Sequence, residues 1–521
     1  MPLGALFPFT FPSVVPSSIM TVHDSCVRIM TVGDHPVPIT VGIDIGTTSV
    51  KALAVSGEGE VLARARVPHH VIHTSGDHME HNALAAWRHG PLRAFTAVRE
   101  AVTGVNAARS DAAAPTYIAG VCVAGMVPSL TAVNRRGIPH TPGLLYGDIR
   151  GRNPDPGSPG DSRSGPMPDA EGFLRWTAQQ MPDAFGFWPA QAVATYALTP
   201  RPAIDTAVAS TLGELYASGR WNNELLTRFG VDPGQLPQVV PTGRSAGTLR
   251  RSRTLVGTDM IGPAGMAGRD HPETVVAGGT IDAFCDQIVA GANEVGDVLV
   301  IFGATLVVWV VTDTWVEIPG LWTVPHTVSG RVLLGGPSNA GALFVDWARS
   351  LLRSGHTTGP SDRGRSGDPR RVPVWLPYVR GERVPFHDTT LRAALVDLDI
   401  TDDPPTISRA AYEASGFVVR NILERTGVKG RRIVASGGGI QRAAWMAGVA
   451  DATGLPVDPV AVPEGAALGA AYLARMAAGL EASLEGSASW ARQGQRIDPD
   501  PSWQQATDAR YQRFTALGTG F

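Results

Sequence analysis

The feature that most constrains the fold of this chain is a strand–turn–strand pattern that occurs twice. Residues 41–56 read VGIDIGTTSVKALAVS, so two apolar runs flank a turn of glycine and hydroxyl residues, with one acid, Asp44, inside the first run. Residues 297–313 read DVLVIFGATLVVWVVTD and repeat the pattern. Apolar, β-branched runs on either side of a glycine turn are typical of a β-hairpin. The repeat predicts two domains that each begin with the same hairpin.

Length and composition limit the class of protein. A chain of 521 residues with 43% apolar and 17% charged residues is long enough for two hydrophobic cores and has a globular composition. The net charge of -3 provides no basic surface for a nucleic acid. The three cysteines form no CxxC pair, which argues against a zinc site or disulfides and fits the cytoplasm. The longest apolar run, residues 298–311, is shorter than the roughly 20 residues that span a bilayer, so no membrane association is expected.

Helical patterns alternate with short apolar strands around the two hairpins, which predicts a mixed α/β fold. Residues 83–102 have a helical pattern and are followed by the strand-like run 117–125. Residues 151–172 and 353–371 are rich in Gly, Pro, Ser and charged residues and are expected to be exposed insertions. The first 38 residues are expected to be irregular.

The first hairpin turn has the groups that a phosphate site needs. The N–H groups and hydroxyls of Gly46, Thr47 and Thr48 could donate to phosphate oxygens, while Asp44 could hold Mg²⁺ through water. An ordinary hairpin with a polar tip has the same pattern, and this stretch alone does not separate the two interpretations. A Walker loop is excluded because the Gly-Lys-Ser/Thr ending is missing.

Two further positions could complete such a site. Gly303 and Thr305 in the second turn could clamp phosphates from the other side, although a buried hairpin with one threonine is also common. Asp282 follows a glycine pair at a predicted strand-to-helix junction. An aspartate there can be only a helix N-cap, but beside a sugar hydroxyl it can accept the proton during phosphoryl transfer.

A run of glycines lies in the last third of the chain. Gly437, Gly438 and Gly439 separate an apolar strand from a helical pattern, and Gln441 follows them. Without side chains, such a turn lets an adenine or a ribose approach the backbone. Arg442 stands where a dinucleotide fingerprint needs its third glycine, so a nicotinamide dehydrogenase is disfavoured. A glycine turn that enters a helix without a ligand stays an alternative.

Taken in order, these motifs resemble the FGGY carbohydrate kinases, the family of xylulokinase, ribulokinase, gluconokinase and glycerol kinase. The resemblance spans about residues 39–479 and is carried by GIDIGTTSVKA, GGTIDAF, FGATLVV, PYVRGERVPFHD and the stretch from ASGGGIQ to EGAALGAAYLA. It implies an α/β, two-lobed actin/hexokinase-like (ribonuclease H-like) fold of duplicated domains. A cleft between the lobes would close over ATP, Mg²⁺ and a sugar or polyol.

The resemblance also implies the domain boundaries. An irregular extension, residues 1–38, would precede a sugar-binding lobe, residues 39–292. A nucleotide-binding lobe, residues 293–480, and a C-terminal tail, residues 481–521, would follow.

The same resemblance assigns roles to individual residues. It makes Asp282 the catalytic base, which would also contact the substrate, and Asp44 the magnesium-associated aspartate. Met126, Asp148 and Arg150 would lie near the sugar, although a structural ion pair of the last two is equally open. The nucleotide would contact two phosphate turns and an adenosine turn, formed by Gly46, Thr47, Thr48, Gly303, Thr305, Gly437, Gly438, Gly439 and Gln441.

Two departures bear on the substrate. Residues 124–128 read AGMVP where xylulokinase-like members have GQMHG, and Ala283 replaces an asparagine common after the base. A site that loses hydrogen-bonding side chains should select hydroxyl patterns differently. The acceptor therefore stays open among pentuloses, tetritols, gluconate-like acids and less usual ligands.

The sequence predicts an enzyme that phosphorylates a primary hydroxyl of a small sugar, sugar acid or polyol with ATP in the cytoplasm. Its expected partner is this small molecule, without nucleic acid or membrane, and a homodimer is left open. The alternative is a non-catalytic, nucleotide-binding protein of the same fold that acts as a sensor. Asp44 and Asp282 argue against the sensor, because a binding module has no need of a base.

Overall fold

The computed structural model describes residues 36–72, 78–108, 116–146, 148–151, 169–250, 273–352, 368–388 and 390–518. Most of the two expected insertions and the first 35 residues lie outside these ranges. Among the described residues, no helix combines the length and the apolar character needed to cross a membrane.

The first half of the chain builds a sheet with the strand order β14-β15-β6-β1-β2-β3, and β16 also pairs with β6. Strands β1, β2 and β3 form the antiparallel meander that the sequence predicts, and β6 and β15 add to it in parallel. Strand β1 starts at Val37, two residues before the expected boundary, because Val37 already pairs with Thr116 of β6. The strand bounds are β1 (Val37–Ile45), β2 (Ser49–Val55), β3 (Val61–Pro68), β6 (Thr116–Gly125), β14 (Ser245–Thr248), β15 (Val275–Ala277) and β16 (Thr280–Ile281).

The second half repeats this arrangement with the order β19-β20-β18-β17-β23-β24. Strands β17 and β18 form the second expected hairpin, β20 continues it antiparallel, and β23 and β24 pair in parallel. Two sheets that share this order are what a duplicated fold requires. The bounds are β17 (Asp297–Phe302), β18 (Leu306–Thr312), β19 (Trp322–Pro325), β20 (Val332–Ser338), β23 (Arg432–Ser436) and β24 (Val457–Pro459).

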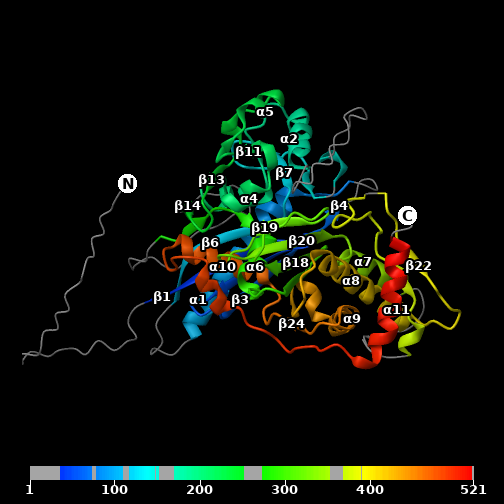
Figure 1. The fold of residues 1–521 in the computed structure, drawn as a ribbon. Helices are drawn as coiled ribbons and strands as arrows, with labels where there is room; N and C mark the ends of the chain where they lie inside the picture. The colour runs from blue at the N-terminus through cyan, green and yellow to red at the C-terminus, as the bar shows by residue number, and fades with distance from the viewer. Residues whose placement is uncertain are drawn as a thin grey trace, which may run out of the picture.

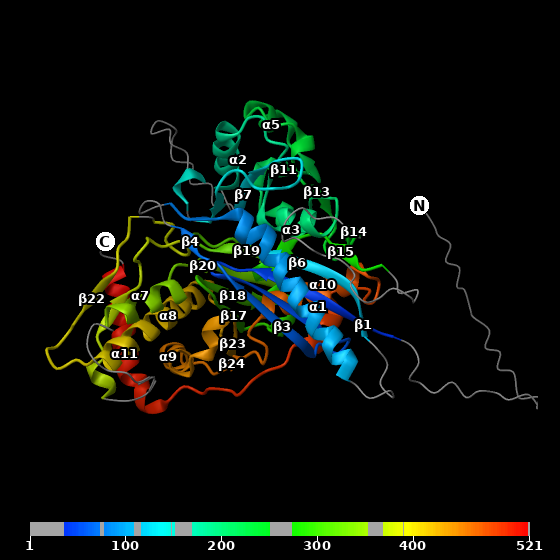
Figure 2. The same ribbon diagram turned by 180° about the vertical axis from the view of Figure 1, so that it is seen from behind.

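Helices cover both faces of the first sheet. Helix α1 (Gly90–Ala108) packs on one face, where Figure 2 shows it lying across the meander, and α10 (Gly465–Ala477) packs on the other. The small residues of α10 allow a close approach, since a Cβ on Gly42 would lie 1.8 Å from the Ala467 carbonyl oxygen. Helix α6 (Asp282–Ala290) packs against α10 and also contacts β17 and β23. The helices α6 and α10 therefore link the two sheets.

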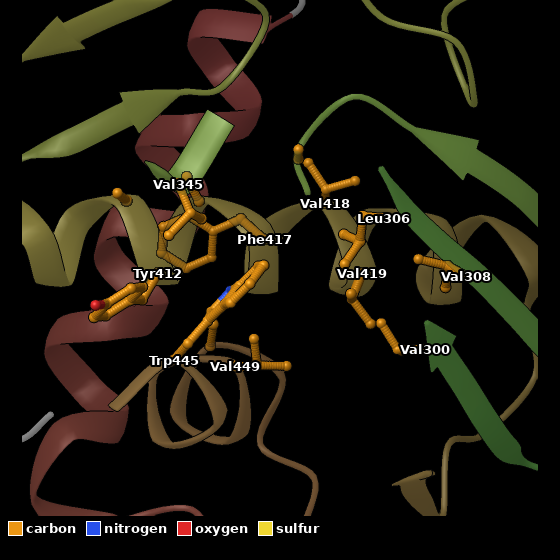
Figure 3. Close-up of a cluster of buried hydrophobic side chains, with 14 of the residues drawn as sticks. Val300, Leu306, Val308, Val345, Tyr412, Phe417, Val418, Val419, Trp445 and Val449 are labelled. Atoms are coloured by element: carbon orange, nitrogen blue, oxygen red, sulfur yellow. The ribbon is translucent and has the colours of Figure 1, made fainter. Parts of the chain in front are cut away.

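The second sheet has its own core, formed with α8 (Pro404–Thr426), α9 (Ala443–Thr453) and α11 (Pro501–Gly518). Figure 3 shows Tyr412, Phe417 and Trp445 grouped beside the valines of β17 and α8. Helix α11 lies in the segment expected as a tail, and it contributes Trp503 and other buried aromatic side chains to this core. The tail is therefore part of the second core, since its aromatic side chains bury apolar area there.

A smaller region, which includes α2 and α5, stands at the opposite end of the molecule from α9 and α11 (Figure 1). A separate five-stranded sheet with the order β4-β5-β8-β7-β9 lies beside it and supplies residues of the site described below. The remaining elements are β4 (Val71–Ile72), β5 (Glu80–His81), β7 (Ser129–Val133), β8 (Gly143–Leu145), α2 (Asp169–Gln180), β9 (Gly186–Trp188), α3 (Ala190–Leu198), β10 (Ala203–Asp205), α4 (Thr206–Ser210), β11 (Tyr216–Ala217), β12 (Arg220–Trp221), α5 (Asn223–Arg228), β13 (Gln238–Val240), α7 (Ala342–Leu351), β21 (Val374–Leu376) and β22 (Ala394–Val396), together with a π-helical turn (Leu84–His89) and short 3-10 turns.

Candidate active site

Asp44 lies buried at the end of β1, where the strand register places it opposite Lys51 of β2. The Lys51 ammonium is 3.0 Å from the Asp44 Oδ2 atom, and this carboxylate raises the pKa of Lys51. The Oδ1 atom of Asp44 has no hydrogen-bond partner among the described residues. A buried carboxylate oxygen without a partner is costly, so this atom is suited to a ligand.

Asp282 is the first residue of α6, directly after β16. The N-cap of the helix is Ile281, so Asp282 is not the capping residue, and its Oδ1 atom accepts a 2.7 Å hydrogen bond from the Ala283 N–H. Burial and then the charge of Asp44 raise the pKa of Asp282 to about 6, against the Ala283 N–H and Lys51. Such a carboxylate is ionised at neutral pH yet more basic than an exposed one.

Asp286 lies one turn further along α6, on the same face as Asp282. Its Oδ1 atom accepts a hydrogen bond of 2.5 Å from the Ser436 hydroxyl at the end of β23. Burial raises the pKa of Asp286 to about 7, and the charges of Asp44 and Asp282 act in the same direction. The sequence analysis did not identify Asp286, although the spacing of four from Asp282 on a helix was a signal for it.

The glycine turn follows Ser436 directly and lies against the end of β17. Gly437 has a φ of +88°, and a Cβ on it would lie 2.9 Å from the Phe302 carbonyl oxygen. Gly438 is exposed, and no atom would lie within 4 Å of a Cβ on it. Gln441 is exposed and lines a surface groove of about 710 Å³. The structure thus brings the glycine turn next to the second hairpin turn.

The second hairpin turn holds the start of α7. The carbonyls of Gly303 and Ala304 accept hydrogen bonds of 2.9 and 3.1 Å from the N–H groups of Ala342 and Leu343. Thr305 is half-buried. The turn is therefore anchored by a helix, as a rigid phosphate clamp would require.

The first hairpin turn is held by a chain of hydrogen bonds that the sequence analysis did not anticipate. The indole N–H of Trp87 donates to His81 Nδ1 at 3.0 Å, and His81 Nε2 lies 2.8 Å from the Thr47 carbonyl oxygen. Because an indole N–H can only donate, Nδ1 must be the acceptor and Nε2 must carry the proton. Burial lowers the pKa of His81 to about 4, so the ring is neutral. Thr48 at the tip is exposed.

The hydroxyl of Thr47 is hydrogen-bonded to the Tyr146 hydroxyl at 2.9 Å. Burial raises the pKa of Tyr146, while the Thr47 bond and the charges of Arg383 and Arg380 lower it in part, and Asp282 raises it. The Tyr146 hydroxyl is therefore bonded to the first turn and influenced by charged groups of both halves. The sequence analysis missed this tyrosine because it lies almost 100 residues from Thr47.

Asp148 and Arg150 form an ion pair, which is one of the two roles that the sequence left open for them. The Arg150 Nη2 atom is 2.6 Å from both Asp148 Oδ2 and Glu80 Oε2, and Asp148 also accepts a 2.7 Å hydrogen bond from the Met79 N–H. The charge of Arg150 is thus compensated within the protein. Contact of this pair with a sugar stays a prediction.

The side chain of Met126 is buried and is not exposed to a sugar in this structure. It follows β6, its side chain is 3% exposed, and it belongs to the first hydrophobic core. The Gln191 amide donates to the Gly125 carbonyl at 2.8 Å and to the Met126 carbonyl at 3.3 Å. A role for Met126 at the sugar stays a prediction, and in this structure its side chain packs in the core.

The loop after β21 brings residues of the second half over the first. Glu382 is buried and accepts hydrogen bonds from the Ser338 hydroxyl (2.7 Å), the Asn339 N–H (2.8 Å) and the Arg383 N–H (2.7 Å). The Arg383 guanidinium lies 5.8 Å from the centroid of the Tyr146 ring. Local patterns gave no signal for Glu382 or Arg383, which lie in the motif PYVRGERVPFHD of the family resemblance.

No group of three or more His, Cys, Asp and Glu side chains is placed to hold a metal ion in the part of the chain that the structure describes. Asp44 fits a magnesium ion bound mainly by water and phosphate, since its Oδ1 atom is buried without a partner. Asp44, Asp282 and Asp286 form one acidic cluster with Lys51, as their mutual electrostatic effects show.

Comparison with known proteins shows that this chain is similar to carbohydrate kinases. Residues 298–478 match the C-terminal domain of the FGGY family of carbohydrate kinases. The chain is similar to the xylulose kinase of Staphylococcus xylosus, with 23% identity over 84% of this chain and 90% of the relative, and to that of Streptomyces rubiginosus, with 28% identity over 85% and 88%. A solved xylulose kinase structure from Rhodospirillum rubrum has a TM-score of 0.68 at 24% identity and covers 92% of this chain and 98% of that one.

These matches agree with the fold of two repeated sheets. The fold is the two-domain, actin/hexokinase-like arrangement expected from the sequence, and the alternative of a non-catalytic sensor is not favoured. Residues 298–478 therefore match the FGGY family of carbohydrate kinases, and the relatives of the whole chain support a sugar kinase of that type.

Proposed function

We propose that this kinase transfers the γ-phosphoryl group of ATP to a primary hydroxyl of a small sugar, sugar acid or polyol. The observation that carries the proposal is the placement of Asp282 within one acidic cluster with Asp44, next to the glycine turn through the bond between Asp286 and Ser436. Phosphoryl transfer needs a base, a cation site and phosphate donors in one place. The cluster supports that combination.

The two hairpin turns would bind the phosphates. The turn that contains Gly46, Thr47 and Thr48 is held from behind by His81, so its groups keep one geometry. The turn that contains Gly303 and Thr305 is anchored on α7. Lys51 adds a positive charge beside the first turn. Backbone and hydroxyl donors on fixed turns stabilise phosphate charge without reorganisation.

Asp44 would hold Mg²⁺ through water with its unpartnered Oδ1 atom. When bound, the ion would neutralise charge on the phosphate oxygens. The turn from Gly437 to Gly439 would receive the adenosine, because Gly438 leaves open space at the backbone and Gln441 lines the adjoining groove.

Asp282 would accept the proton of the attacking hydroxyl. With a pKa raised to about 6 by burial, its carboxylate is ionised at neutral pH and is a better proton acceptor than an exposed aspartate. The hydroxyl becomes acidic only late in the transfer, so this pKa is sufficient.

The two halves of the chain would bind different substrates of the reaction. Residues 39–292 would bind the acceptor and residues 293–480 the nucleotide, while α10 of the second segment packs on the first sheet. Residues 481–521 complete the second core through α11. The acceptor is proposed only as a class here: the relatives are named xylulose kinases, but Val127 and Ala283 replace polar residues of the xylulokinase-like pattern.

An ADP-release assay with MgATP tests the proposal across xylulose and other pentuloses, tetritols, glycerol, gluconate and related acids. Acceptor-dependent ADP release is expected with at least one of these compounds. ATP binding without acceptor-dependent release from any of them would contradict the proposal and favour a nucleotide-binding sensor.

A further inference from the structure

The loop after β21 presents a second arginine, Arg380, on the acceptor side of the candidate site. The loop is fixed at its centre by the buried Glu382, and the Asn339 side chain donates to the Gly381 carbonyl at 3.0 Å. Arg380 itself is exposed, and its Nη1 atom donates to the Met79 sulfur at 3.3 Å. A guanidinium of the second half therefore lies directly on a residue of the first half.

The Arg380 guanidinium has N–H donors that are available to a ligand. Within the described ranges it forms no ion pair with a carboxylate, and a thioether is a weak acceptor. Arg150 provides the contrast, because Asp148 and Glu80 compensate its charge at 2.6 Å each. Of these two arginines, Arg380 is the one whose charge is left for a ligand.

Several contacts place Arg380 beside the proposed acceptor position. Met79, which it touches, donates its N–H to the carboxylate of Asp148. Arg383 lies over Tyr146, and the Tyr146 hydroxyl is bonded to Thr47 of the first phosphate turn. The charges of Arg380, Arg383 and Asp282 all act on this one hydroxyl. Two cations and the proposed base therefore all act on the Tyr146 hydroxyl, which contacts the first phosphate turn.

We propose that the acceptor is an acid: a carboxylate at the end remote from the reacting hydroxyl is bound by Arg380, with Arg383 adding positive charge. The proposal rests on the proposed kinase function and names its substrate class, the aldonates and related hydroxy acids. A guanidinium binds a carboxylate through two parallel hydrogen bonds, which a neutral alcohol end cannot match. Val127 and Ala283 stand where the xylulokinase-like pattern has polar residues, so fewer side chains are available to hydrogen-bond the hydroxyls of the acceptor. The charge of the acceptor therefore becomes the main feature by which the site can select it.

Matched acceptor pairs test this proposal, because an aldonate and its alditol differ only at one end. The pairs are glycerate and glycerol, erythronate and erythritol, ribonate and ribitol, and gluconate and glucitol, each assayed for kcat/KM with saturating MgATP. The wild type is compared with Arg380→Gln, with Arg380→Lys, and with Arg392→Gln as a control at another exposed arginine of the same lobe.

For at least one pair, the wild type should prefer the acid. Arg380→Gln should lower kcat/KM for that acid by about 10- to 100-fold, the effect of losing a charge-assisted pair, and leave the alditol within about twofold. Arg380→Lys should recover part of the loss, and Arg392→Gln should behave as the wild type. An unchanged acid-to-alditol ratio in Arg380→Gln would overturn the proposal. So would an equal loss for both acceptors with a raised KM for ATP, which would assign Arg380 to the nucleotide.

A binding measurement separates this proposal from the kinase function. If no acceptor is phosphorylated, the kinase proposal fails, and calorimetric titration of the aldonates into wild type and Arg380→Gln then decides the role of Arg380. Binding of an aldonate to the wild type that is lost in Arg380→Gln would uphold the acid site. Equal binding to both proteins, or binding to neither, would overturn it.

Discussion

The hydroxyl of Ser436 donates a 2.5 Å hydrogen bond to the carboxylate of Asp286, and this bond joins β23 to the helix that carries Asp282. The contact is tightly enclosed, because a Cβ on Gly465 would lie 2.1 Å from the same carboxylate oxygen. It sets the glycine turn, which follows Ser436, at a fixed place relative to the acidic cluster.

Ser436→Ala should destabilise the protein more than Asp286→Asn. The serine variant leaves a buried carboxylate without its donor, which costs about 1–3 kcal/mol, whereas the asparagine amide oxygen still accepts the bond. The asparagine also removes a negative charge that acts on Asp282. Urea unfolding of both variants at neutral pH measures the difference. Equal losses would contradict this difference, and a neutral Ser436→Ala would show that the bond does not matter for the fold.

His81→Leu should impair the use of ATP, because it removes the donor that holds the Thr47 carbonyl. A roughly tenfold loss in kcat/KM for ATP is expected, in line with one lost buried hydrogen bond. His81→Gln should retain most activity, since its amide N–H can donate to the same carbonyl. The neutral ring, with its pKa lowered to about 4 by burial, also predicts no change of KM for ATP near pH 6.5 from this residue. Wild-type kinetics in His81→Leu would contradict the positioning role.

Gly437→Ala should lower the stability of the protein, whereas Gly438→Ala should affect the binding of ATP. Alanine at Gly437 would be strained at a φ of +88° and lie 2.9 Å from the Phe302 carbonyl oxygen, so a loss of about 1 kcal/mol or more in stability is expected. Alanine at Gly438 meets nothing within 4 Å and should leave the melting temperature unchanged. If adenosine lies on this turn, Gly438→Ala should still raise the KM for ATP. A wild-type KM there would move the nucleotide elsewhere.

Glu382 should make stability depend on pH. Burial raises its pKa from 4.5 to about 7, against the hydrogen bonds from Asn339, Ser338 and Arg383. The folded state therefore holds the proton more tightly, so this contribution to stability is complete below pH 4.5 and is lost as pH rises through about 7. The loss amounts to about 3 kcal/mol. Glu382→Gln has no carboxyl group that titrates at this position, so it does not lose stability in this way. The unfolding free energy of the variant, relative to that of the wild type, should therefore rise between pH 5 and pH 8. A difference that is constant with pH would contradict this assignment.

Local patterns were sufficient to predict several elements of the fold. The two glycine turns predicted both hairpins, and the strand-to-helix junction at Asp282 was placed correctly at the start of α6. Helix α8 ends at Gly427, which adopts the left-handed conformation. Helix α11 was missed because its buried aromatic residues form a contact surface only when the second core is assembled.

The contacts between distant segments could not be predicted from local patterns. Thr47 and His81 are 34 residues apart, Asp286 and Ser436 are 150 apart, and Met79 and Arg380 are 301 apart. Each pair depends on how the sheets and the linking helices dock, which periodicity and spacing do not encode. The ion pair of Asp148 and Arg150 was anticipated as an alternative because the two residues are neighbours in sequence.

The most direct test of the central proposal is transfer of the γ-phosphoryl group from labelled ATP to the best acceptor, measured for wild type and Asp282→Ala. Asp313→Asn, a change at an exposed carboxylate of the second lobe, is the control. The wild type and the control should form the phosphorylated acceptor, while Asp282→Ala should bind ATP normally and transfer at least about 100-fold more slowly. Transfer at the wild-type rate in Asp282→Ala would contradict the role of Asp282 as the base.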